Sequence, residues 1–176
     1  MKSIVFIGYM GSGKTTMTKY IGNHIDGIDI YDIDDMIKSE EGMEISRIFE
    51  IKGEDYFRNL EAKKLEELAL KLTPKIVSTG GGVVEREDNI SLLKKVGLVV
   101  FLDSPIEVLW DRVGLDPQRP LAANKDKFFA LYESRRAKYL QASDIIIDSS
   151  GFHKNGDNID EVAGIILDEI LEECNE

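Results

Sequence analysis

A glycine-rich segment near the start of the chain restricts the fold more than any other feature. Residues Gly8–Thr15 match the pattern G-x-x-x-x-G-K-[ST] at every fixed position. The segment follows the apolar run Ile4–Ile7 and overlaps the start of a helical pattern, Lys14–His24, which is the context that this motif requires. Glycines in such a loop let several backbone N–H groups converge on one anion. The sequence therefore predicts a site for the phosphates of a nucleoside triphosphate.

Individual residues of this loop have distinct expected contacts. The first turn of the following helix presents backbone N–H groups and a positive dipole to the phosphates. Lys14 can span the β- and γ-phosphates of ATP, and the Thr15 hydroxyl is a suitable ligand for Mg²⁺. The expected ATP-binding residues of the loop are Gly11, Ser12, Gly13, Lys14, Thr15 and Thr16. A glycine-rich turn that only caps a helix is the alternative, and the motif does not identify an acceptor.

Size, charge and cysteine content narrow the class of protein. The chain has 176 residues, of which 43% are hydrophobic, so we expect one domain over residues 1–176. A formal net charge of -11 argues against sequence-independent nucleic-acid binding, which needs clustered Lys and Arg. The single cysteine, Cys174, excludes an internal disulfide. No apolar stretch approaches the ~18 residues of a membrane span, so we expect a cytoplasmic protein without membrane partners.

Short β-branched segments alternate with longer amphipathic ones along the chain. The expected strands are Ile4–Ile7, Gly27–Tyr31, Ile76–Ser78, Leu98–Leu102 and Ile145–Ile147. The expected helices are Lys14–His24, Asp35–Ser39, Ile45–Phe49, Gly53–Leu72, Asn89–Lys95, Pro105–Val113, Lys125–Ala142 and Asn158–Glu173. All strands except the second are nearly all apolar, which is typical of parallel strands buried on both faces. The alternation predicts βαβ units in a three-layer α/β/α domain.

Two carboxylates follow the second expected strand. In a strand-end geometry Asp32 and Asp34 point to the same side, ~6–7 Å apart along the chain. At the carboxyl end of a parallel sheet they face the crevice where ligands bind. One carboxylate can hold the water shell of Mg²⁺, and the other can accept a proton from a substrate hydroxyl. The alternative is that both only cap the helix expected at Asp35–Ser39.

Two further segments are candidates for binding an acceptor. Arg58 lies in an amphipathic helix with Glu61 three residues later, and its guanidinium suits a carboxylate ligand. An ordinary surface pair with Glu61 is the alternative. The glycines of the segment Thr79–Gly82 are entropically unfavourable at a strand end, so they predict either close approach of the backbone to a ligand or a loose turn. The proline-containing stretch Gly114–Asn124 is typical of a mobile lid, expected at about residues 112–124.

Taken together, these segments resemble the shikimate kinase family. The pattern Arg58-x-x-Glu61-x-x-x-Leu65, followed by Ile76–Val83 with its triple glycine, is similar to that family's signature. The resemblance covers nearly the whole chain and is weakest after Tyr139. It implies a P-loop kinase fold with a five-stranded parallel sheet of order 2-3-1-4-5 and a substrate-binding helical region at about residues 33–61. It also implies Mg²⁺-dependent transfer of the ATP γ-phosphoryl group to the 3-hydroxyl of shikimate, in the chorismate pathway to aromatic amino acids.

The resemblance further implies roles for single residues on both sides of the reaction. Asp34 would bind the substrate hydroxyls as base or orienting group, while Asp32 would reach Mg²⁺ through water. The remaining implied substrate contacts are Arg58 and Arg135 on the carboxylate and the backbone of Gly80, Gly81 and Gly82 on the ring hydroxyls. Lys14 and a lid arginine, Arg119, would stabilise the transferring phosphoryl group, and Arg112 would lie against the adenine.

The chain departs from the family pattern near its last substrate arginine. The family has Arg-x-Pro-Leu-Tyr where this chain has the segment Arg135–Tyr139. Counting back from Tyr139 selects Arg135, and the adjacent Arg136 stays open as the alternative. Two rival functions also remain: a kinase for another small metabolite such as gluconate, and a non-catalytic nucleotide-dependent switch. We expect a monomer that binds ATP and shikimate and no nucleic acid.

Overall fold

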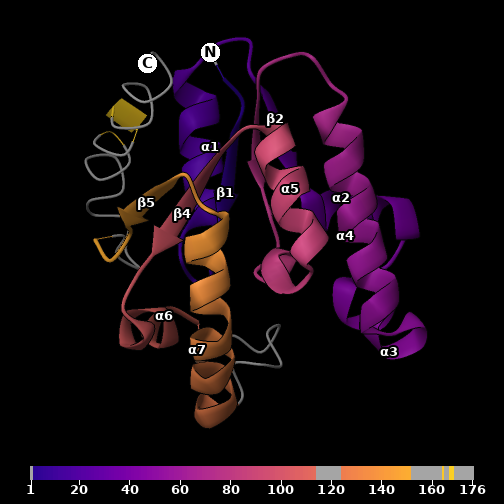
Figure 1. Cartoon of the computed structure of the whole chain (residues 1–176), viewed down its shortest axis with the longest axis vertical. Helices are drawn as coiled ribbons and strands as arrows, with labels where there is room; N and C mark the ends of the chain where they lie inside the picture. The colour runs from indigo at the N-terminus through magenta and orange to yellow at the C-terminus, as the bar shows by residue number, and fades with distance from the viewer. Residues whose placement is uncertain (1, 114–123, 152–163, 165–166, 169–176) are drawn as a thin grey trace.

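Parallel strands form the centre of the molecule. The structure is a computed structural model, and it describes residues 2–113, 124–151, 164 and 167–168. Its strands are β1 (Ile4–Ile7), β2 (Asp29–Asp32), β3 (Lys75–Ser78), β4 (Leu98–Asp103) and β5 (Ile145–Asp148). They form one 5-stranded sheet in the order β2-β3-β1-β4-β5, and every adjacent pair is parallel (Figure 1). The strand order and the sheet type confirm the expected fold class.

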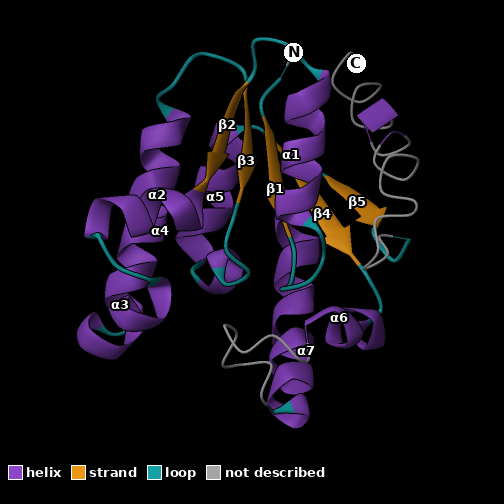
Figure 2. Ribbon diagram, turned by 180° about the vertical axis from the view of Figure 1, so that it is seen from behind, coloured by secondary structure: helices purple, strands orange, loops and turns teal. Residues whose placement is uncertain are grey.

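Helices cover both faces of this sheet. They are α1 (Lys14–His24), α2 (Ile33–Glu41), α3 (Ile45–Lys52), α4 (Glu54–Ala69), α5 (Glu87–Val96), α6 (Ile106–Val113) and α7 (Lys125–Ala142), with a short 3-10 turn, η1 (Val83–Glu85). Helices α5 and α7 lie in front of the sheet in Figure 1, whereas α1 lies in front in the reverse view of Figure 2. Layers on both sides are the arrangement expected for a parallel sheet, whose two faces must both be buried.

Alternate residues of β1 belong to two separate cores. Ile4 and Phe6 pack with Met17 and Ile21 of α1 in one cluster. Val5 and Ile7 belong to the larger cluster on the opposite face, to which α2 through α7 contribute. Because successive side chains of a strand point to opposite faces, an all-apolar strand can serve both cores. The complete burial of β1 therefore fixes the position of the loop that follows it.

The sequence prediction was wrong for the fifth strand, which is not buried on both faces. β5 pairs only with β4 at one edge of the sheet, and Ile146 keeps 51% of its surface exposed. Its composition is apolar like that of an inner strand, so the sequence pattern could not show that it is an edge strand. Most of the helix expected at Asn158–Glu173 and residues 114–123 of the expected lid lie outside the described residues.

Helix α2 begins earlier than the sequence pattern suggested. The Asp32 carboxylate accepts hydrogen bonds from the backbone N–H groups of Asp34 (3.0 Å) and Asp35 (3.3 Å), which caps the helix. Asp34 therefore lies in the first turn of α2 and not in a strand-end geometry, so that expectation was wrong. The alternative, in which both aspartates only cap the helix, is met in part, because Asp32 caps α2 and Asp34 does not. The Asp32 cap turns the chain so that Asp34 approaches the end of β3.

The region expected to bind the acceptor, about residues 33–61, is built from α2, α3 and the first half of α4. Ion pairs join these helices, among them Lys63 with Glu40 at 2.7 Å and Lys52 with Glu41.

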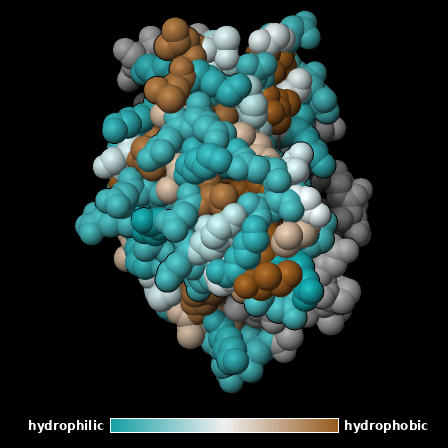
Figure 3. Space-filling view, turned by 90° about the vertical axis from the view of Figure 1, so that its right-hand side faces the viewer, coloured by the Kyte–Doolittle hydropathy of each residue, from teal (hydrophilic) through white to brown (hydrophobic). Residues whose placement is uncertain are grey.

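The face seen in Figure 3 is largely hydrophilic with small scattered apolar patches. No helix within the described ranges is both long enough and apolar enough to cross a membrane.

Candidate active site

The phosphate-binding loop is folded around the amino group of Lys14. Its Nζ donates hydrogen bonds to the backbone carbonyl oxygens of Gly8 (2.7 Å) and Tyr9 (3.0 Å). Gly13, which precedes α1, has a φ of 96°, in the left-handed region that glycine adopts readily. Ser12 and Lys14 are both buried. The loop thus forms a concave end to α1 in which a phosphate can meet backbone N–H groups and a lysine.

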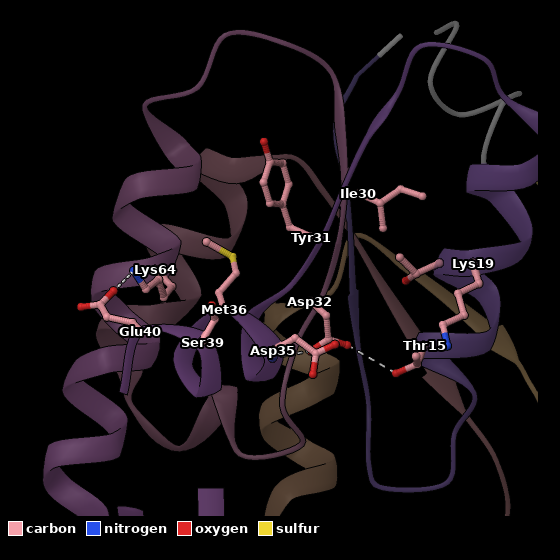
Figure 4. A pocket seen from close by; sticks show the side chains of 11 residues that line it. Thr15, Lys19, Ile30, Tyr31, Asp32, Asp35, Met36, Ser39, Glu40 and Lys64 are labelled. Carbon is pink, nitrogen blue, oxygen red and sulfur yellow. Dashed lines mark hydrogen bonds and ion pairs between the residues drawn. The ribbon is translucent and has the colours of Figure 1, made fainter. Parts of the chain in front are cut away.

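Thr15 and Asp32 lie side by side at the rim of this loop. The Thr15 hydroxyl donates to Asp32 Oδ2 at 3.5 Å, as the dashed line in Figure 4 shows. The other carboxylate oxygen of Asp32 accepts the hydrogen bond that caps the start of α2. A hydroxyl and a carboxylate oxygen are the ligand types that Mg²⁺ prefers, and Mg²⁺ keeps several waters of its own. The two residues expected to hold the ion are therefore in contact and fit it.

A pair of buried carboxyl groups faces the first glycine after β3. Asp34 Oδ1 and Glu61 Oε1 are buried and have no hydrogen-bond partner among the described residues. A methyl group placed on Gly80 would lie 2.8 Å from Asp34 Oδ1 and 3.0 Å from Glu61 Oε1, so both oxygens point at one spot. They are open acceptors for hydroxyl groups of a ligand.

Burial also changes the acidity of these two groups. It raises the pKa of Asp34 to about 6, with a smaller contribution from the negative charge of Asp32. Burial likewise raises the pKa of Glu61 to about 7, against the opposing charge of Arg58. Shifted pKa values of this kind are concentrated at functional sites. A general base works best when its pKa lies near the working pH, so the raised pKa makes the Asp34 carboxyl well suited to accept a hydroxyl proton.

Arg58 approaches the same glycine segment from α4, beside Gly82. Its guanidinium pairs with Glu61 at 2.5 Å and with Glu54 at 3.0 Å. The side chain is buried, so the contact with Glu61 is not the ordinary surface pair that was the alternative. A methyl group on Gly82 would lie 2.2 Å from Arg58 Nη2. The glycine at this position therefore leaves room for the guanidinium, which gives the segment a packing reason that a loose turn lacks.

The structure separates the two candidate arginines of α7. Arg135 is buried, and its Cζ lies 5.9 Å from the centre of the Tyr9 ring in the phosphate-binding loop. Arg136 has 43% of its side chain exposed and pairs with Asp103 at 2.8 Å. Tyr139, one turn further along α7, donates its hydroxyl to the carbonyl oxygen of Gly81. Arg135 thus lies on the side of α7 that faces the glycine segment.

Arg112 connects the phosphate-binding loop to the far edge of the sheet. Its guanidinium donates to the carbonyl oxygens of Gly11 (3.0 Å), Ser149 (2.8 Å) and Ser150 (2.9 Å). This places the residue beside the nucleotide loop, as the sequence prediction requires, but its role toward adenine stays a prediction. Arg119, the expected lid arginine, lies outside the described residues.

Sequence reasoning singled out Asp34, Arg58 and the glycines, but it missed what Glu61 and Tyr139 contribute. Glu61 was seen only as the partner of Arg58, whereas its second oxygen opens onto the same spot as Asp34. The spacing Arg58-x-x-Glu61 places both residues on one helix face and was the available signal. Nothing in the sequence could show that Tyr139 would contact Gly81, because the two are distant along the chain.

A hollow of about 650 Å³ opens beside the Thr15–Asp32 pair. It is lined by α1, the edge strand β2, α2 and Lys64 of α4, as Figure 4 shows. Its lining includes neither Arg58 nor the glycines Gly80 to Gly82. The candidate acceptor site is therefore defined by the convergence of polar groups and lies outside the lining of this hollow.

These features define a nucleotide-dependent phosphotransferase of the P-loop kinase class. A family model described as shikimate kinase matches residues 10–174, almost the whole chain. The chain therefore belongs to the shikimate kinase family. It is 40% identical over 152 residues to a shikimate kinase of Persephonella marina, covering 86% of this chain and 91% of that protein.

Another relative and two solved structures that resemble this chain are also shikimate kinases. A shikimate kinase of Caldicellulosiruptor bescii is 45% identical over 127 residues, which are 72% of this chain and 73% of that protein. The structure of an Acinetobacter baumannii shikimate kinase in complex with shikimate superposes with a TM-score of 0.85 and 31% identity, covering 98% of this chain and 94% of that one. The Aquifex aeolicus enzyme has a TM-score of 0.82 and 34% identity, with 98% of each chain covered.

Proposed function

We propose that this chain transfers the γ-phosphoryl group of ATP to the 3-hydroxyl of shikimate, giving shikimate 3-phosphate and ADP. One observation carries the proposal: two buried carboxylate oxygens, which have no hydrogen-bond partner among the described residues, and the buried Arg58 lie against the glycine segment, and the buried Arg135 contacts the turn that follows it. Shikimate presents hydroxyl groups and one carboxylate, so its polar groups match this arrangement of acceptors and cations.

The acceptor residues divide into two sets by charge. Arg58 and Arg135 supply cations for the carboxylate, and a guanidinium can bind a carboxylate through two parallel hydrogen bonds. Asp34 and Glu61 accept hydrogen bonds from ring hydroxyls. The hydroxyl bound to Asp34 is the one to be phosphorylated, because Asp34 also lies close enough to Lys14 for that charge to lower its pKa. Asp34 orients this hydroxyl and takes its proton as the new P–O bond forms.

The nucleotide side supplies positioning and positive charge. Phosphoryl transfer depends mainly on alignment and on neutralising charge at the γ-phosphate oxygens. Lys14 and the N–H groups at the start of α1 provide that charge, and Arg119 is proposed to add to it. Thr15 directly and Asp32 through water would hold Mg²⁺, which supplies charge stabilisation to the phosphates when bound. Arg112 is proposed to contact adenine.

A coupled assay of ADP release tests the proposal. We expect ADP formation with Mg²⁺ and shikimate together, and only slow release when either is omitted. Gluconate and a no-acceptor reaction serve as parallel controls, because a gluconate kinase would respond to the first. A nucleotide-dependent switch would hydrolyse ATP at the same slow rate whichever acceptor is present, which would contradict the proposal. We also propose a monomer, and sedimentation analysis checks it.

A further inference from the structure

Arg135 is held by a carboxylate that no sequence argument singled out. Its Nε donates to Glu85 Oε1, and the other Glu85 oxygen accepts from Lys138 Nζ at 2.6 Å. Glu85 belongs to η1, which begins directly after Gly82, whereas both cations belong to α7. One carboxylate therefore joins the end of the glycine segment to the helix that carries Arg135.

This contact determines which atoms of Arg135 remain for a ligand. A guanidinium can bind a carboxylate either through Nε and one terminal nitrogen or through both terminal nitrogens. Since Glu85 occupies Nε, only the second geometry is open. Neither terminal nitrogen of Arg135 has a hydrogen bond to any residue within the described ranges. The guanidinium of Arg135 is thus held by Glu85 through Nε, and its two terminal nitrogens remain for a ligand.

The surroundings keep the guanidinium in this orientation. Arg135 has only 7% of its side chain exposed, and the ring of Tyr9 lies below it. Burial would raise the pKa of Glu85, but the hydrogen bonds from Lys138 and Arg135 outweigh it and hold that pKa below its usual value. Glu85 is therefore ionised near neutral pH, and its carboxylate holds both cations of α7.

We propose that Glu85 is a positioning residue for substrate binding: it fixes Arg135 so that both terminal nitrogens face the acceptor carboxylate. The inference rests on the proposed function, in which Arg135 binds the carboxylate of shikimate. Glu85 itself does not touch the substrate. Its effect is expected in the KM for shikimate and not in the KM for ATP, because only the acceptor side depends on the orientation of Arg135.

Two substitutions separate positioning from charge. Glu85→Asp keeps the negative charge but shortens the side chain, so that it no longer reaches Nε. Glu85→Gln keeps the reach and one acceptor oxygen but removes the charge. Positioning predicts that Glu85→Asp raises the KM for shikimate about fivefold or more, whereas Glu85→Gln changes it less. If Glu85 only balanced the charges of Arg135 and Lys138, then Glu85→Gln would have the larger effect.

Lys138→Met is the matched control, because it removes the other partner of Glu85 and leaves the contact with Arg135 in place. We expect its KM for shikimate to stay within about twofold of the unsubstituted chain. Melting temperatures of all variants show that each is folded before its KM is measured.

Repeating both Glu85 substitutions in an Arg135→Met background completes the experiment. The two variants should then have the same KM for shikimate, because the residue that Glu85 positions is gone. A reversed order of the two variants, equal effects in the original background, or a difference that persists without Arg135 would each overturn the inference. An unsubstituted chain that is inert toward shikimate would instead overturn the proposed function, and the inference with it.

Discussion

The phosphate-binding loop and the acceptor site are built in opposite ways. The loop is one continuous segment, Gly8–Thr15, and its lysine is bonded to carbonyl oxygens of the same segment. The acceptor site is assembled from α2, α4, the end of β3 and α7, and two of its buried carboxylate oxygens have no hydrogen-bond partner in the part of the chain that the structure describes. The loop is therefore shaped largely by contacts within one short segment, whereas the acceptor site depends on contacts between distant elements and on a ligand to satisfy its polar groups.

Because the two regions are built differently, substitutions in them should have different effects. Substitutions in the acceptor site should change the use of shikimate while leaving ATP binding nearly intact, since the loop does not depend on acceptor residues. The same substitutions should also alter stability, because the site contains charges buried at an energetic cost. Such a compromise between stability and function is common at active sites.

The largest effect is expected for Asp34→Asn. The amide cannot accept the hydroxyl proton, so we expect kcat to fall by about 10²–10⁴-fold, with the affinity for ATP unchanged. Asp35→Asn is the matched control, because Asp35 is the exposed next residue and pairs with Lys38 at 2.6 Å. Coupled ADP release and titration with a fluorescent ATP analogue measure the two quantities. Near-normal turnover of Asp34→Asn would refute the assigned role.

Arg58→Ala should mainly weaken shikimate binding. Loss of one buried cation facing the carboxylate predicts a rise in the KM for shikimate of about 10–100-fold. It also leaves the buried Glu61 without its partner, so a lower melting temperature is expected. Arg47→Ala on α3 is the control, because Arg47 forms an exposed pair with Glu50. An unchanged KM for shikimate would count against this assignment.

Neighbouring glycines provide a finer comparison within the acceptor site. Gly82→Ala places a methyl group 2.2 Å from Arg58 Nη2 and must displace the guanidinium, whereas on Gly81 the nearest atoms lie at 3.6 Å. We expect Gly82→Ala to raise the KM for shikimate about tenfold and Gly81→Ala less than threefold. Steady-state kinetics with shikimate varied at saturating ATP measure both. Equal effects of the two substitutions would contradict the positioning of Arg58 by Gly82.

The smallest expected effect concerns stability and pH. The pKa of Glu61 is raised to about 7 by burial, so the folded protein holds this proton more tightly than the unfolded chain does. The stabilising contribution is present below the usual glutamate pKa and is lost as the pH rises through about 7. The Gln side chain of Glu61→Gln cannot ionise, so this variant does not lose stability as the pH rises. We expect its melting temperature at pH 8 to be about 3–6 °C higher than that of the unsubstituted chain.

Thermal unfolding between pH 5 and pH 8 measures this effect. The melting temperature of the unsubstituted chain should fall over this range more than that of Glu61→Gln. Glu66→Gln on the exposed side of α4 is the control and should leave the curve unchanged. Parallel curves for Glu61→Gln and the unsubstituted chain would show that Glu61 is not a buried, destabilised carboxylate.

How much the sequence predicted follows the same contrast between the two regions. The phosphate-binding loop could be predicted because its spacing is local and its strand and helix flank it directly. The strand order and Arg135 came from a family resemblance, whereas Asp34, Arg58 and the glycines were already candidates from the residues alone. Asp34 was assigned to a strand end because the residue types did not decide between that geometry and helix capping, and the structure shows its N–H bonded to the Asp32 cap of α2.

Contacts between distant segments were beyond any sequence pattern. Counting back from Tyr139 selected Arg135 but left Arg136 open, because only the structure shows which side of α7 faces the glycine segment. The contact of Glu85 with Arg135 joins two elements that no spacing relates. The partial exposure of β5 likewise depends on its place at the edge of the sheet.

A crystal structure of this chain with shikimate and ADP tests the account most directly. We expect the shikimate carboxylate to lie between Arg58 and the terminal nitrogens of Arg135, and a ring hydroxyl that faces the nucleotide to be bound by Asp34. Shikimate bound instead in the hollow between α1 and α4, or with its carboxylate away from both arginines, would contradict it.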